Sequence, residues 1–92
     1  LTANTTANHN VAMGYQTLRD NTTGYSNTAL GSQSMCLNTT GYRNTATGFQ
    51  ALGANTTGCL NTASGYLALA ANTTGCRRTL YVVIQQVVII LQ

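Results

Sequence analysis

Charged side chains are rare in this chain, and lysine, glutamate, proline and tryptophan are absent. About a quarter of the residues in an ordinary globular domain are charged, whereas only five of the 92 are charged here: Arg19, Asp20, Arg43, Arg77 and Arg78. Four arginines without a basic stripe argue against a nucleic-acid-binding protein. One carboxylate and one histidine form neither a carboxylate pair nor a base with an orienting partner, so we expect no enzyme and no cofactor.

What the chain has instead is a repeat of 17 residues. The tetrad Asn-Thr-Thr-Gly, with a degenerate copy at residues 4–7, recurs in constant phase, and a second asparagine column keeps step with it. Self-similarity at one fixed period is typical of a stacked solenoid, in which each coil contacts only its neighbours. The tetrads begin at Asn21, Asn38, Asn55 and Asn72, and the second column consists of Asn10, Asn27, Asn44 and Asn61.

Two glycine columns in each period predict two corners in each coil, because glycine reaches positive φ and asparagine suits turns. The columns are Gly24, Gly41, Gly58 and Gly75, which form structural turns with the tetrad asparagines, and Gly14, Gly31, Gly48 and Gly65. Between the corners lie two short runs rich in threonine, tyrosine and alanine, of which the threonines and tyrosines favour strands. We therefore predict an all-β protein. It is a parallel β-solenoid, or β-roll, with one 17-residue coil per repeat and about five coils stacked ~4.8 Å apart.

The core of such a coil must be thin. An invariant alanine column fits a place where two walls of the coil approach closely, and a column of leucine and methionine fills the wider part: Ala29, Ala46 and Ala63, then Leu18, Met35, Leu52 and Leu69. We expect the asparagine columns to point inward or to cap bends, with ladders of amides between coils. The alternative is a stripe of glycans, because each Asn-Thr-Thr is an N-glycosylation sequon.

Three cysteines and one histidine are the soft metal ligands of the chain, and the repeat phase places them in different coils and columns: His9, Cys36, Cys59 and Cys76. We therefore expect no metal site. Cys59 and Cys76 share a column, so their Cα atoms should lie one coil apart, ~4.8 Å, which allows a disulfide. The alternative is a pair of small apolar fillers in a column that holds tyrosine elsewhere.

The repeat array covers residues 1–77, which we interpret as a fragment of a longer array, and residues 78–92 form a hydrophobic tail out of phase with it. Arg78 stands where the repeat has asparagine, and Val82 stands where it has glycine. Codons for residues 78–84 can be chosen that spell Asn-Thr-Val-Cys-Gly-Tyr in another frame, so the tail is interpretable as a frameshifted repeat. The rival interpretations are an aggregation-prone strand or a last apolar coil. The tail is too short to span a bilayer, which takes ~20 residues.

The run from Asn44 to Gly58, Asn-Thr-Ala-Thr-Gly-Phe-Gln-Ala-Leu-Gly-Ala-Asn-Thr-Thr-Gly, resembles the head repeats of trimeric autotransporter adhesins, the YadA-like β-roll. Similar coils occur in phage and bacterial tail-fibre-like proteins. The resemblance extends over residues 1–77. It implies a non-enzymatic surface fibre, either a homotrimer or an end-to-end or lateral assembly, that is extracellular, on a cell surface or on a virion. Its ligand would belong to a host surface or matrix.

Two functions remain after these exclusions. An adhesive or structural fibre would present its variable columns to a ligand, and the candidate ligand face is Arg19, Ser26, Arg43 and Leu60. An ice-binding protein is the alternative, because some threonine-rich β-solenoids bind ice. Such proteins need two outward threonine columns spaced i, i+2, and only Thr45 and Thr47 form that pair.

Overall fold

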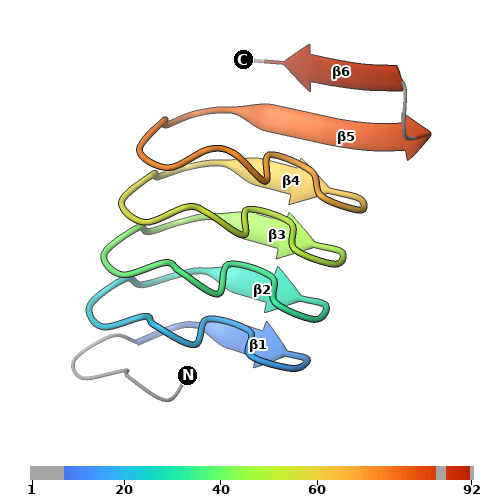
Figure 1. Cartoon of the computed structure of the whole chain (residues 1–92). Coiled ribbons are helices and arrows are strands. Elements are labelled where there is room, and N and C mark those ends of the chain that lie inside the picture. The colour runs from blue at the N-terminus through green and yellow to red at the C-terminus, as the bar shows by residue number, and fades with distance from the viewer. Residues whose placement is uncertain (1–7, 85–86, 92) are drawn as a thin grey trace.

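The computed structural model describes residues 8–84 and 87–91 of the chain. In this part every element is a strand, and the strands form one sheet in the order β1-β2-β3-β4-β5-β6 (Figure 1). The strands are β1 (Val11–Met13), β2 (Thr28–Leu30), β3 (Thr45–Thr47), β4 (Thr62–Ser64), β5 (Thr79–Ile84) and β6 (Val87–Leu91).

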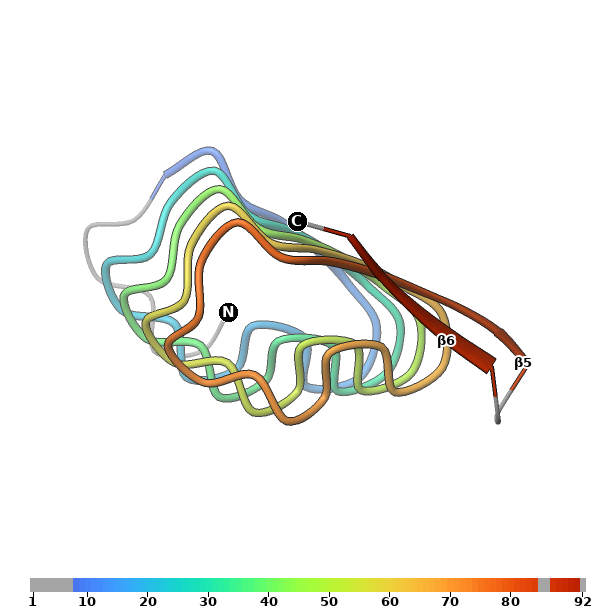
Figure 2. The ribbon, with the colours of Figure 1, turned by 90° about the horizontal axis from the view of Figure 1, so that it is seen from above.

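Strands β1 to β5 are parallel, and each residue pairs with the one 17 positions later. Ala29, for example, pairs with Ala46, and Ala46 pairs with Ala63. Seen from above, the successive coils follow one another closely around a common outline (Figure 2). The predicted all-β parallel β-solenoid of five 17-residue coils is therefore confirmed.

Each coil contains one strand, and the prediction of a second strand is wrong. The residues between Gly14 and Asn21, and their equivalents in later coils, form a turn wall instead. Along it the backbone N–H groups donate alternately to the next coil and to their own coil. The N–H of Leu18 donates to Ser34 O of the next coil at 3.2 Å, whereas the N–H of Thr17 donates to Gly14 O of its own coil at 3.4 Å. Left-handed φ angles at alternate positions of the wall, 50° at Leu18 for example, prevent the extended conformation of a strand.

The two glycine columns serve different purposes. Gly48 and its equivalents after each strand have φ between 118° and 128°, as the sequence predicts for a corner. The tetrad glycines do not adopt positive φ, so that expectation is wrong for them. They are needed for close approach, because a Cβ on Gly58 would lie 2.6 Å from the carbonyl oxygen of Gly75 in the next coil.

The interior is a narrow apolar file enclosed by asparagine ladders. Ala29, Ala46 and Ala63 face Leu18, Met35 and Leu52 in one cluster, and all six are fully buried. Beside them, the side-chain amides of Asn38, Asn55 and Asn72 each donate to the amide oxygen of the tetrad asparagine one coil below, and the Nδ2–Oδ1 distances are 2.8 to 2.9 Å. These amides are internal, which favours the ladder over a stripe of glycans.

The tail begins in phase and then departs from the solenoid. Thr79 and Leu80 pair in register with Thr62 and Ala63, as a further coil would. Strand β5 then continues straight past the point where the other coils turn, and β6 returns antiparallel to it (Figures 1 and 2). The interpretation of the tail as a last apolar coil is therefore wrong, and its origin as a frameshifted repeat stays a prediction. Within the described residues, no helix has the length and hydrophobicity needed to cross a membrane.

Candidate functional site

The outward face of the parallel strands is a regular surface that runs along the solenoid. The middle residue of each strand points into the core, so the first and third residues point outward. One outward column is nearly all threonine, whereas the other changes from coil to coil: Val11, Thr28, Thr45, Thr62 and Thr79, then Met13, Leu30, Thr47 and Ser64. Met13 is 69% exposed and Val11 is 52% exposed, so this face becomes more apolar toward the first coil.

The structure brings together three of the four residues of the candidate ligand face. Ser26, Arg43 and Leu60 are exposed and occupy one column, with the N–H of Arg43 donating to Tyr25 O at 2.9 Å. All three have φ of 56° or 57°, which turns their side chains away from the coil at the corner before the strand. Arg19 lies apart from them on the turn wall.

Arg19 pairs with its neighbour in sequence. Its Nε donates to Asp20 Oδ1 at 2.9 Å. This hydrogen bond lowers the pKa of the Asp20 carboxyl below its usual value and raises the pKa of the Arg19 guanidinium. Both groups are exposed to solvent, so the pair contributes little to stability.

Two stacks of aromatic rings run parallel to the solenoid axis. Tyr25 and Tyr42 stack with ring centroids 5.1 Å apart, and Phe49 and Tyr66 stack with centroids 5.6 Å apart. The rings are partly exposed, and the tyrosine stack borders the column of Arg43. Stacks of this kind provide flat surface that costs little conformational entropy on binding.

In the two coils above Tyr42, cysteines occupy the tyrosine column and form a disulfide. Cys59 and Cys76 are joined, with their Cα atoms 4.6 Å apart. Cys36 is a free, partly buried thiol, and burial is the main cause that raises its pKa. No three metal-ligating side chains come together in the part of the chain that the structure describes.

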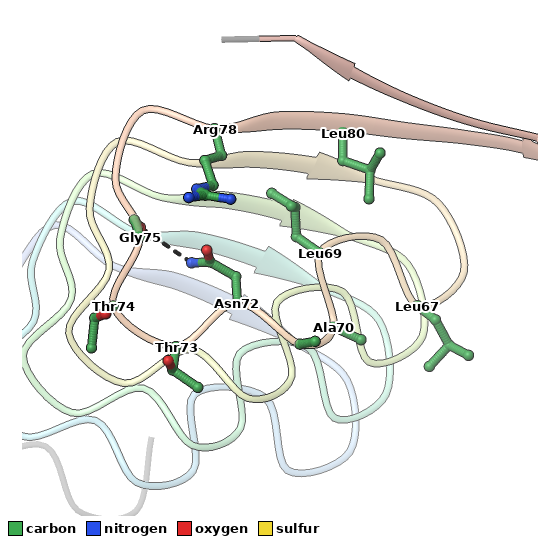
Figure 3. Close-up of a pocket in the computed structure, with 10 residues that line it drawn as sticks. Leu67, Leu69, Ala70, Asn72, Thr73, Thr74, Gly75, Arg78 and Leu80 are labelled. Carbon is green, nitrogen blue, oxygen red and sulfur yellow. Dashed lines mark hydrogen bonds between the residues drawn. The ribbon is translucent and has the colours of Figure 1, made fainter.

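The last regular coil carries a cavity of about 630 Å³ on its upper side (Figure 3). Its lining includes the final members of internal columns, among them Leu69, Asn72 and Gly75. In lower coils the equivalents of these residues are covered by the next coil. Arg78 extends into this cavity toward Gly75 and Asn72, as Figure 3 shows.

Two features of these surfaces were not predicted from the sequence. Gln16, Gln33 and Gln50 form a ladder on the turn wall, with Nε2–Oε1 distances of 3.4 and 2.7 Å. The backbone N–H groups of the tetrads that begin at Asn21, Asn38 and Asn55 also form cradles that bind the coil above. The glutamine column was visible in the repeat, but the cradle depends on backbone angles that the tetrad letters do not specify.

Comparisons with known proteins give no match: no family model, no curated protein and no solved structure is similar to this chain. The function must therefore be argued from the surfaces of the solenoid itself.

Proposed function

We propose that this chain is a non-enzymatic structural or adhesive element of a fibre, which presents an extended surface to a ligand on a host cell or matrix. The observation that carries this proposal is the contrast between constant buried columns and a variable exposed column. Between residues 21 and 63 the inward asparagine and alanine columns are constant and fully buried, whereas the exposed column of Ser26, Arg43 and Leu60 changes its chemistry from one coil to the next. A constant frame with variable outward positions is how solenoid proteins build binding surfaces.

The exposed apolar and aromatic side chains support the same proposal. Leu60 and Tyr25 are each 38% exposed, on neighbouring columns, and Arg43 lies between their coils. Aromatic residues and arginine are enriched in the parts of interfaces that contribute most to affinity. We propose an extracellular, cell-surface or virion location and a homo-oligomeric fibre, a trimer by its resemblance to adhesin heads.

The experiment is an adhesion assay with microspheres coated with the purified chain. The spheres should be retained on immobilised matrix proteins or cultured cells more than albumin-coated spheres are. The double variant R43S/L60S should reduce retention, whereas T57S, an exposed change in the same part of the solenoid, should not. Equal retention of all coated spheres, or retention no better than albumin, would contradict the proposal. Sedimentation equilibrium tests the oligomer separately, with a trimer expected.

One observation favours ice binding as a second candidate. Thr28, Thr45, Thr62 and Thr79 pair in register, so they form a straight threonine column on the flat outer face of the sheet. The second column is threonine only at Thr47, which makes the adhesive proposal stronger. Thermal hysteresis that is abolished by T45Y would establish ice binding, whereas an adhesive fibre element should give none.

A further inference from the structure

In three successive coils a cradle of donors holds one carbonyl oxygen of the coil above. The N–H groups of Thr22, Thr23 and Gly24 all donate to Thr39 O, at 3.0, 3.2 and 3.0 Å. The Thr22 hydroxyl donates to the same oxygen at 3.2 Å. Successive N–H groups that converge on one point form a nest, a backbone geometry that binds anions.

The same arrangement recurs in the next two coils. The equivalent donors of residues 39–41 bind Thr56 O, and those of residues 56–58 bind Thr73 O, with N–O distances between 3.0 and 3.2 Å. Three occupied cradles in one molecule establish that this backbone geometry holds an oxygen atom.

The fourth cradle lies at the end of the solenoid. It consists of the N–H groups of Thr73, Thr74 and Gly75 and the hydroxyl of Thr73, which we call the end nest. No acceptor for these three N–H groups lies among the residues that the structure describes. All three residues line the cavity of about 630 Å³ above the last coil (Figure 3).

Arg78 gives this cavity a positive charge. Its backbone N–H still donates to Asn61 Oδ1 at 2.9 Å, as an asparagine of the repeat would. Its side chain, however, reaches over the last coil, and its Nε would lie 2.7 Å from a Cβ placed on Gly75. Asp20 is the only acidic side chain in the sequence, and it pairs with Arg19, so no side-chain carboxylate neutralises Arg78.

We propose that the end nest and Arg78 together bind an oxyanion, a carboxylate or a phosphate group. One oxygen takes the position that Thr39 O, Thr56 O and Thr73 O occupy in the lower cradles. A second oxygen faces the guanidinium, which is suited to two-point binding of planar or tetrahedral oxyanions. This site is separate from the outward columns and does not depend on an adhesive function.

Two contacts favour a small anion over a further coil of a second molecule. Arg78 Nε stands above Gly75 where, one coil lower, the carbonyl oxygen of Gly75 stands above Gly58. In addition, β6 pairs with β5 along the strand edge that a further coil would use. A coil would have to displace both, whereas an anion displaces neither.

The test is an NMR titration of the ¹⁵N-labelled full chain with sodium phosphate and, separately, with sodium acetate. Sodium chloride at matched ionic strength is the reference. The amide signals of Thr73, Thr74 and Gly75 should shift and saturate, while those of residues 39–41 should not. R78N should weaken binding by about fivefold, as for the loss of one exposed charge pair. R77N, an exposed arginine one residue earlier, should bind as the unchanged chain does.

Saturation with either anion supports the proposal, and the tighter of the two identifies the preferred ligand chemistry. Shifts that chloride reproduces, shifts that do not saturate, or equal binding by R78N would overturn it. The amides of residues 22–24 and 39–41 report whether R78N keeps its coils. If the end-nest signals move with protein concentration alone and sedimentation shows dimers, the nest binds a second copy and the proposal is wrong.

Discussion

The coils of β1 to β4 and the tail start their strands in the same way and end them differently. Thr62 in β4 and Thr79 in β5 open their strands in the same column and in register. β4 ends after three residues at a corner, whereas β5 runs for six and is followed by an antiparallel partner. The start column therefore sets the register of a strand, and a separate residue decides whether the chain turns back into a coil.

That residue is the corner glycine. Gly48 has a φ of 124°, and a Cβ there would lie 2.6 Å from the carbonyl oxygen of Gly65. The tail has Val82 at the equivalent position. A β-branched residue is strongly disfavoured at positive φ, so the chain continues as an extended strand and the turn wall does not form.

The substitution G48V is the strongest test of the corner glycine and should have the largest effect on stability. It places valine, the residue of the tail, at a corner inside the regular array. Positive-φ strain and the clash with Gly65 should together lower the free energy of unfolding by about 4 kcal/mol or more. Urea unfolding followed by circular dichroism measures this loss. G53A is the control, because that column carries side chains in other coils, and it should change stability little.

The substitution N38A tests the internal ladder that the tail lacks. It removes the bond that Asn38 Nδ2 donates to Asn21 Oδ1 and the bond that Asn38 Oδ1 accepts from Asn55 Nδ2, both between buried groups. It also removes the bond from Asn38 Nδ2 to Gly41 O. At about 1 kcal/mol for each bond, the loss should be about 3 kcal/mol of unfolding free energy. The exposed change T40A in the same coil is the matched control for the urea experiment. A loss for N38A no larger than for T40A would mean that the ladder contributes little.

Reduction of the Cys59–Cys76 disulfide tests how firmly the last coil is attached. The bond closes a loop of 17 residues, so reduction should lower the unfolding free energy by about 2 kcal/mol. The double variant C59Y/C76Y should recover about 1 kcal/mol of this by extending the stack of Tyr25 and Tyr42. Unfolding with and without a phosphine reductant gives both values; no difference on reduction would count against the linkage.

The substitution V82G should have the smallest effect on stability. It reverses the comparison by placing the corner glycine of the regular coils in the tail. Glycine at this position weakens the β5 strand and makes the corner conformation accessible, which should destabilise the β5–β6 pairing by about 1 kcal/mol. Hydrogen exchange of the β6 amides measures the opening free energy. V83G removes an equal side chain outside the corner column, so it should have a smaller effect. Equal values for the two variants would argue against a special role for the corner column.

The period of the repeat was sufficient to predict the architecture, the axial register and the inward asparagine, alanine and leucine columns. It did not predict that Leu18 and Met35 adopt φ near 50°, because propensity gives no reason for a buried apolar residue to be left-handed. Intercoil hydrogen bonds from these residues override the local preference. The end nest could not be predicted either, because its donors are backbone N–H groups, which every residue except proline possesses.

The column of Ser26, Arg43 and Leu60 could be predicted from the sequence, because one period separates its residues. Arg19 belongs to a second variable column, which lies on the turn wall. That these residues bind a ligand stays a prediction. The β5–β6 hairpin could not be predicted from repeats at all, because the tail has none of its own.

The tetrad asparagines have a consequence for arrays of different length. Every Nδ2–Oδ1 bond in the ladder points the same way, from Asn72 through Asn55 and Asn38 to Asn21. Aligned amide dipoles polarise one another, so each added bond strengthens those already formed. Stability per coil should therefore rise with the number of coils, and the two ends of the file should carry opposite partial charges. A rod built this way has a net dipole along its axis, in addition to the N-to-C direction of its coils.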